Sequence, residues 1–169
     1  MTILAAGVAA PDFALTDAEG VTRSLAVERA RGLTLVAFFS LECRACDLSY
    51  VFWDRMHEAY AAAGCPVLAI SLDSPEAARE FHERSGVSFA VLAEPEPATA
   101  RASGLECTPS LFLVDADGVV LASHDAFDRA ALNALSEEIA RRLGRPAEAL
   151  SEGETPAFSP GCTVHVAPA

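Results

Sequence analysis

The chain has 169 residues, 51% of them hydrophobic, and a formal net charge of −12. This length and apolar content allow a buried core and favour a single domain. The negative charge argues against nucleic acid or an anionic membrane surface as a partner. No stretch approaches the roughly 18 apolar residues of a membrane span, and residues 1–4 lack the basic region of a secretory signal. We therefore expect a cytoplasmic protein, unless a leader has been removed.

The first half of the chain predicts a hairpin, a central strand and a long helix. Residues 13–16 and 21–25 are strand-like and flank a turn that contains glycine, which predicts a hairpin near the N-terminus. The apolar run 33–39 is typical of a central strand that is covered on both faces. From residue 43 to about 63, apolar side chains recur at every fourth position, which predicts a helix that Gly64 ends.

Shorter elements follow this helix. Residues 67–72 are apolar and predict a second buried strand. A Ser-Pro pair then starts a helix over residues 75–85, which a glycine ends. Residues 89–92 predict a short strand or extended segment, and residues 97–103 predict a short helix.

The end of the chain predicts a hairpin, a helix and a tail. Residues 111–114 and 119–121 flank an Asp-Ala-Asp-Gly turn, and the last helix is expected to begin near Asp125. Strands that alternate with helices, followed by a hairpin and a helix, indicate an α/β fold with a mixed central sheet flanked by helices. We divide the chain into a domain over 1–144 and a proline-rich tail over 145–169, which either wanders or lies extended on the domain.

Cys43 and Cys46 lie between the predicted central strand and the long helix. The first turn of a helix has unpaired N–H groups and a partial positive charge, which favour a thiolate at that place. The two-residue spacing lets the second thiol close a disulfide on the first, but it also suits half of a zinc site. The pair alone leaves redox chemistry and metal binding open.

Four segments, in this order, carry a resemblance to a known family. They are residues 10–15, the pair at 43–46, Thr108-Pro109 before the next strand, and the hairpin at 112–118. Together they resemble the thioredoxin superfamily, and more narrowly its redoxin and TlpA-like, AhpC/TSA-related thiol–disulfide oxidoreductases. The resemblance covers residues 8–143 and implies a thioredoxin-like fold with an N-terminal β-hairpin extension.

By this resemblance, Cys43 is the exposed nucleophile that attacks a substrate disulfide, and Cys46 is the resolving thiol. Pro109, if cis, faces the cysteine pair, and the Thr108 backbone pairs with the substrate chain like an added strand. The implied partners are protein or small-molecule disulfides and dithiols, with an electron donor of unspecified identity. The resemblance implies no metal and no organic cofactor, and it implies a role in antioxidant activity and redox homeostasis.

Several residues around the pair depart from the family pattern. Glu42 stands where tryptophan is common, and its carboxylate should raise the pKa of Cys43, whereas Arg44 should lower the same pKa. Ala45 replaces the common proline, and Ala37 replaces a buried acid of the preceding strand. We therefore expect a redox potential and a proton path that differ from those of an ordinary thioredoxin.

Two other functions remain open. A peroxiredoxin-like peroxide reductase would also use Cys43, and Ser40 stands where such enzymes keep a hydroxyl that contacts peroxide. Against this function, Val36 replaces the expected proline and Pro109 replaces the arginine that pairs with peroxide. The other alternative is a non-enzymatic thioredoxin-fold domain that binds metal or a partner through its cysteines.

Cys107 and Cys162 are candidates for further redox thiols. Cys107 lies on the loop before the predicted cis-proline, near Cys43 in the fold, and a plain loop thiol is the alternative. Cys162 lies on the tail. It could return to pair with Cys107, or it could join His165 and the cysteine pair in a zinc site.

Overall fold

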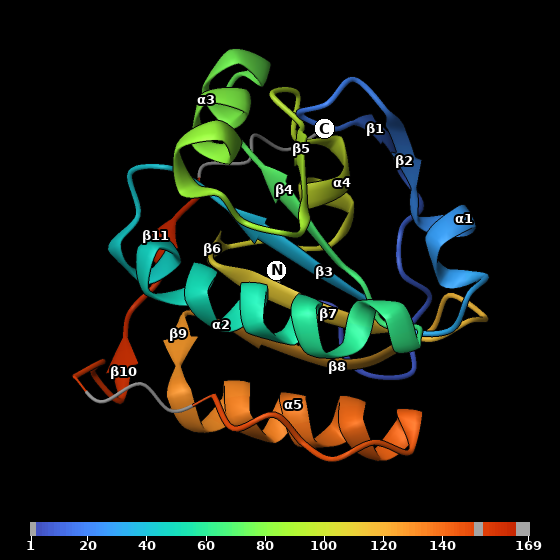
Figure 1. Ribbon diagram of the computed structural model, residues 1–169. Coiled ribbons are helices and arrows are strands. Elements are labelled where there is room, and N and C mark those ends of the chain that lie inside the picture. The colour runs from blue at the N-terminus through green and yellow to red at the C-terminus, as the bar shows by residue number, and fades with distance from the viewer. Residues whose placement is uncertain (1–2, 151–153, 165–169) are drawn as a thin grey trace.

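A mixed five-stranded sheet forms the centre of the molecule in the computed structural model, which describes residues 3–150 and 154–164. In order across the sheet, the strands are β5 (Ala90–Ala93), β4 (Val67–Ser71), β3 (Thr34–Phe39), β7 (Ser110–Val114) and β8 (Val120–Asp125). β3, β4 and β5 are parallel, whereas β7 is antiparallel to both β3 and β8 (Figure 1). Every residue of β3 is buried, as expected for a central strand with both faces covered.

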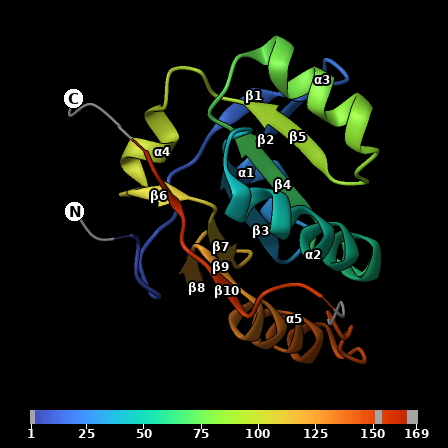
Figure 2. The same ribbon diagram turned by 90° about the vertical axis from the view of Figure 1, so that its left-hand side faces the viewer.

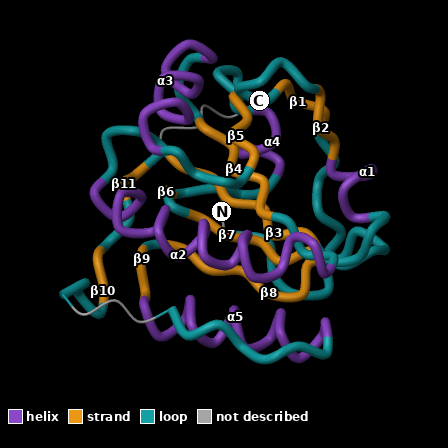
Figure 3. Tube along the Cα trace, in the orientation of Figure 1, coloured by secondary structure: helices purple, strands orange, loops and turns teal. Residues whose placement is uncertain are grey.

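Helices cover both faces of the sheet (Figures 1 and 3). α2 (Arg44–Tyr60), α3 (Pro75–Ser85) and α5 (Arg129–Leu143) pack on one face. α1 (Leu25–Arg29) and α4 (Ala98–Ala102) pack on the other, which gives two hydrophobic clusters. In the described part of the chain, no helix combines the length and the apolarity that a membrane crossing needs.

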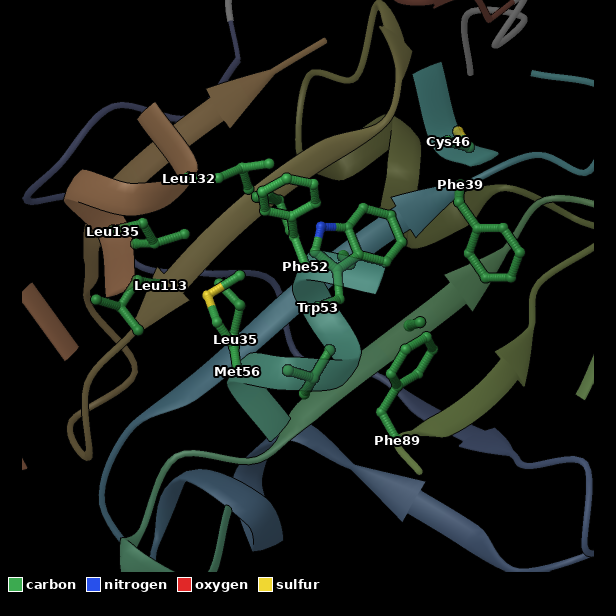
Figure 4. Packing of buried hydrophobic residues seen from close by; sticks show 14 of the residues in the cluster. Leu35, Phe39, Cys46, Phe52, Trp53, Met56, Phe89, Leu113, Leu132 and Leu135 are labelled. Carbon is green, nitrogen blue, oxygen red and sulfur yellow. The ribbon is translucent and has the colours of Figure 1, made fainter. Parts of the chain in front are cut away.

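The larger cluster fixes the helix that begins at the cysteine pair. Side chains of β3 alternate between the two faces, so Leu35 and Phe39 face α2. Figure 4 shows them packed with Phe52, Trp53 and Met56 of that helix, which are all fully buried. Trp53 is a packing residue whose ring meets Phe39 edge-on. This packing holds the first turn of α2 at the C-terminal end of β3.

Local sequence signals mark most element ends. The N-terminal hairpin of β1 (Ala14–Thr16) and β2 (Thr22–Ser24) forms as predicted. α3 begins after Ser74, whose hydroxyl accepts a capping hydrogen bond from a backbone N–H group. α2 passes into a 3-10 turn (Ala61–Ala63), and Gly64 ends this turn in the left-handed conformation that glycine adopts without strain.

Two helices differ from the prediction. The last helix begins at Arg129 and not near Asp125, because β8 extends to Asp125 and is followed by the short strand β9 (Phe127–Asp128). The Asp128 carboxylate caps this helix by accepting a hydrogen bond from the Ala131 N–H group at 3.0 Å. α1 was not predicted, because the sequence pattern assigned its first residue, Leu25, to the second strand of the hairpin.

The C-terminal tail lies extended on the domain, which is one of the two arrangements expected. β10 (Phe158–Ser159) pairs with β9, and β11 (Cys162–Thr163) pairs with β6 (Cys107–Thr108), both antiparallel. Figure 2 shows this red segment running past α5 and along β6. Leu150 is fully buried, and its N–H group donates to Asn133 Oδ1 at 3.0 Å. The division of the chain at residue 144 stays a prediction.

Candidate redox site

The cysteine pair lies where the chain leaves β3 and enters α2. Cys43 is the N-cap residue of α2, and Cys46 lies in the first helical turn. Both cysteines are free thiols. The helix start thus brings backbone N–H groups and the positive end of the helix dipole to the two sulfur atoms, as the sequence predicted.

Cys43 is buried, which corrects the expectation of an exposed nucleophile. Its exposed fraction is 1%, and that of Cys46 is 0%. The Cys43 thiol donates a hydrogen bond to the Thr108 carbonyl oxygen at 3.3 Å, and the Cys162 thiol of the tail lies near enough to lower the pKa of Cys43. Cys43 is therefore covered by the loop before β7 and by the tail.

The Thr108-Pro109 loop packs against the cysteine pair. The peptide bond between these two residues is cis, and both residues are buried. The Thr108 Oγ1 and Ser40 Oγ atoms are 2.6 Å apart, so a hydroxyl pair joins the loop to the end of β3. Ser40 thus has a structural partner, and the loop lies where the resemblance implied.

The environment lowers the pKa of one thiol and raises that of the other. Burial acts to raise the pKa of Cys43, but hydrogen bonds from the Cys162 thiol, the Cys46 amide and thiol, and the Thr108 hydroxyl outweigh burial and lower it. The pKa of Cys46 is raised far above its ordinary value, first by burial and then by the neighbouring Cys43 sulfur. Cys43 therefore ionises first, while Cys46 keeps its proton.

The charged neighbours of Cys43 matter less than the sequence suggested. The Glu42 and Arg44 side chains are both exposed to solvent, which screens their charges. The largest influences on the pKa of Cys43 are burial and the hydrogen bonds to its sulfur. The site therefore stabilises the Cys43 thiolate mainly with uncharged hydrogen-bond donors and not with charged side chains.

The two remaining candidate thiols lie on paired strands. In the register of β11 with β6, Cys162 is opposite Thr108, and Cys107 is opposite Thr163. Cys107 and Cys162 thus point to opposite faces of the two-stranded ribbon, which disfavours the pairing considered from the sequence. The nearby Cys43 thiol, and then burial, raise the pKa of Cys162 to about 11. Burial also raises the pKa of Cys107.

Metal binding finds no support in the described residues. Residues 3–150 and 154–164 contain no group of three or more His, Cys, Asp or Glu side chains placed to hold a metal ion. His165, a member of the zinc site considered from the sequence, lies outside the described residues.

Tyr50 is a neighbour of the pair that the sequence analysis missed. Its ring packs edge-on against Phe39, and its hydroxyl is buried without a hydrogen-bond partner among the described residues. Burial first, and then the nearby sulfur of Cys46, raise its pKa. The signal that could have found it is its place four residues after Cys46, on the same face of α2.

The sequence pattern of the AhpC/TSA family matches residues 6–123. The chain belongs to the AhpC/TSA family. The match includes the N-terminal hairpin, the cysteine pair, the cis-proline loop and the β7–β8 hairpin. It ends before α5 and the tail, so Cys162 lies outside the part that the family pattern describes.

Relatives of this AhpC/TSA-family chain include proteins named thiol-disulfide oxidoreductase ResA. The protein from Geobacillus thermodenitrificans is 30% identical over 120 residues, which are 70% of this chain and 68% of the relative. The protein from Bacillus anthracis is 27% identical over 116 residues, which are 68% of this chain and 66% of the relative.

Solved structures show the same fold. A Chlorobium tepidum protein described as a thiol:disulfide interchange protein DsbE has a TM-score of 0.77 and 32% identity, over 83% of this chain and 99% of that one. Peroxidoxin BcpB from Mycobacterium tuberculosis has a TM-score of 0.68 at 19% identity, over 82% of this chain and 96% of that one. At this identity, the likeness shows only that the two proteins share a fold. The AhpC/TSA-family chain is therefore a thioredoxin-fold oxidoreductase. The predicted fold and the predicted function of thiol–disulfide oxidoreductase agree with these findings.

Proposed function

We propose that the chain catalyses thiol–disulfide exchange, with Cys43 as the nucleophile and Cys46 as the resolving thiol. The observation that carries this proposal is the Cys43–Cys46 pair at the start of α2, beside the cis Thr108-Pro109 bond. The pKa of Cys43 is lowered and that of Cys46 is raised, which fits these two roles. One thiol ionises more readily than an ordinary cysteine and can attack, whereas the other keeps its proton until the first has reacted. Relatives and neighbours named for this reaction support the assignment.

The exchange proceeds in two steps. The Cys43 thiolate attacks one sulfur of a substrate disulfide, a mixed disulfide forms, and the leaving sulfur takes a proton. Cys46 then loses its proton and attacks the Cys43 sulfur. The Cys43–Cys46 disulfide forms, and the substrate leaves as a dithiol. A dithiol donor returns the enzyme to its reduced form by the reverse exchange, and neither step requires a metal or an organic cofactor.

The substrates that fit this site are proteins with disulfide or dithiol groups. A substrate chain would pair with the Thr108 backbone as an added strand and place its sulfur beside Cys43. The Thr108 carbonyl oxygen lies 3.3 Å from Cys43 Sγ, which supports this geometry. The cytoplasmic location and the antioxidant role stay predictions.

Insulin reduction with dithiothreitol tests the proposed function. We expect the unaltered protein to accelerate precipitation of insulin chains, and Cys43→Ser to show only the background rate. Without dithiothreitol, Cys46→Ser combined with Cys162→Ser, which removes the other nearby thiol of the tail, should accumulate a mixed disulfide at Cys43. Cys65→Ala is the matched control, because Cys65 is a buried thiol at the opposite end of the parallel strands, with its pKa raised by burial to about 12. Equal rates for the unaltered protein and Cys43→Ser would contradict the proposal.

Peroxide consumption distinguishes the alternative function. The atoms found around Cys43 Sγ are thiols, a carbonyl, an amide and a hydroxyl, and the described contacts include no guanidinium group to pair with peroxide. We therefore expect slow, Cys43-dependent consumption of hydrogen peroxide compared with insulin reduction. Rapid consumption with no insulin reduction would favour a peroxide reductase.

A further inference from the structure

The tail occupies the edge that the proposed function assigns to the substrate. β11 pairs antiparallel with β6, so that Cys162 is opposite Thr108, the residue before the cis-proline. The ladder continues by one residue, because the Val164 N–H group donates to the Glu106 carbonyl oxygen at 3.0 Å. In Figure 1, β11 lies near the start of α2. The chain thus binds its own C-terminal segment in the manner of an added strand.

This register places a sulfur atom against the nucleophile. Directly opposite residues of an antiparallel pair project to the same face, so the Cys162 side chain shares the face of Thr108. Cys162 packs against the hydrophobic cluster that contains Cys43, and the thiols of Cys162 and Cys43 are near enough for each to shift the pKa of the other. The Arg44 amide, at the start of α2, acts to lower the pKa of Cys162, so the Cys162 sulfur also lies near the helix start. Cys162 therefore lies where the sulfur of a bound substrate is expected.

Glycine at position 161 makes this close approach feasible. A Cβ atom at Gly161 would lie 2.9 Å from Cys107 Sγ and 2.9 Å from the Thr108 carbonyl oxygen. A side chain there would force the tail away from β6, because one of the clashing atoms belongs to the backbone. The tail is thus fitted to the cis-proline loop at the residue next to Cys162.

We propose that Cys162 is an internal substrate thiol, which forms an intramolecular disulfide with Cys43 and must be released before a polypeptide disulfide binds. The inference deepens the proposed function and rests on it, because it assigns the same nucleophile a partner within the chain. It also accounts for the burial of Cys43 in the free protein.

The exchange is balanced without an added oxidant. Starting from the Cys43–Cys46 disulfide, the Cys162 thiol gives its proton to solvent and its thiolate attacks the Cys43 sulfur. The Cys43–Cys162 bond forms while the Cys43–Cys46 bond breaks, and the electron pair leaves on Cys46. Cys46 then takes up a proton, because burial raises its pKa. The reverse reaction releases the tail with no net change in oxidation state.

Tryptic peptides can report this bond directly. The chain contains no lysine, and Arg44 lies between Cys43 and Cys46. Trypsin therefore places Cys43 on peptide 32–44 and Cys46 on peptide 45–55, whereas Cys162 lies on 143–169 because a proline follows Arg145. Each pairing of these cysteines gives a distinct linked mass.

The experiment uses the full-length Cys46→Ser protein, diluted and treated with oxidised glutathione. Glutathione first forms a mixed disulfide with Cys43, and Cys162 then displaces it as reduced glutathione. After alkylation of free thiols, we expect peptides 32–44 and 143–169 to be linked within a monomer. Gly161→Val in the same protein should reduce this link about tenfold, because the added side chain would clash with the Thr108 carbonyl oxygen.

Two further variants separate the effect of tail position from that of folding. Val164→Pro weakens the pairing of β11 with β6 without adding bulk at Gly161, because proline has no N–H group to donate to the Glu106 carbonyl oxygen. It should also reduce the link. Thr163→Ala is the matched control, because the Thr163 side chain is exposed, and it should keep the link.

The change at Gly161 should also affect the rate of insulin reduction. In a protein with both native cysteines of the pair, Gly161→Val should raise kcat/KM for insulin severalfold, because the edge of β6 becomes free for the substrate.

The outcomes distinguish this inference from the proposed function. If the unaltered protein reduces insulin but Cys46→Ser accumulates only glutathione on Cys43, the internal exchange is wrong and the function stands. If the link forms but the unaltered protein does not reduce insulin, the proposed function is wrong although the two thiols meet. A link that persists undiminished in both Gly161→Val and Val164→Pro would also overturn the inference.

Discussion

Two thiols of the same helix turn differ because their surroundings differ. Cys43 sits at the N-cap, where an amide, two thiols and a hydroxyl direct hydrogen-bond donors to its sulfur. Cys46 lies three residues further along, in the first helical turn, where burial dominates and favours the neutral thiol. The difference in pKa between the two thiols therefore comes from hydrogen bonding at Cys43 and burial at Cys46. The exposed charges of Glu42 and Arg44 contribute little.

Thr108→Val tests the contribution of the hydroxyl donor. The change keeps the shape of the side chain but removes the hydrogen bond that lowers the pKa of Cys43. We expect the midpoint of Cys43 alkylation against pH to rise by about one unit, because a hydrogen bond to a charged group contributes roughly 1.5–3 kcal/mol. Iodoacetamide labelling of peptide 32–44 measures this midpoint. Thr108→Ser keeps the hydroxyl and should keep the midpoint, so an equal shift in both variants would contradict the expectation.

Elements that depend on local signals could be predicted from the sequence. Ser74 and Gly86 mark the two ends of α3 because capping and left-handed termination involve only neighbouring residues. The predicted start of α5, near Asp125, was wrong by several residues, because the true start depends on contacts between residues far apart in the chain. β9 exists through its pairing with β10 near residue 158, and two-residue strands have no period of their own.

Ser74→Ala tests the local stabilisation of α3. The Ser74 hydroxyl accepts a hydrogen bond from the Ala77 N–H group at 3.2 Å, and the side chain is exposed, so its loss leaves no cavity. We expect the free energy of unfolding to fall by about 1 kcal/mol, as measured by urea denaturation. Ser74→Asp retains a capping oxygen and should restore most of the loss. Equal stability of Ser74→Ala and the unaltered protein would show that the cap contributes nothing.

At the scale of the whole molecule, the parts of the site formed by the family motifs could be predicted from the sequence, whereas the parts formed by the tail could not. The order of the cysteine pair, the Thr-Pro loop and the closing hairpin identified the fold, because these segments lie in one family pattern. The burial of Cys43 and its contact with Cys162 depend on a strand pairing between residues far apart in the chain. Apolar periodicity fails in the tail, so its register with β6 was not accessible from the sequence.

The tail also belongs to the hydrophobic core through Leu150. This side chain is fully buried in the cluster that contains α2 and α5, and the Glu148 N–H group nearby donates to the Tyr60 hydroxyl at 2.7 Å. Leu150→Ala should lower the free energy of unfolding by about 3 kcal/mol, since it removes buried methyl groups and leaves a cavity. Urea denaturation measures the loss, and Ala149→Ser at the exposed neighbouring position serves as the control. If Leu150→Ala cost no more than the control, residues 145–150 would be a loosely attached appendage. The anchor that holds β11 over Cys43 would then consist of the strand pairings alone.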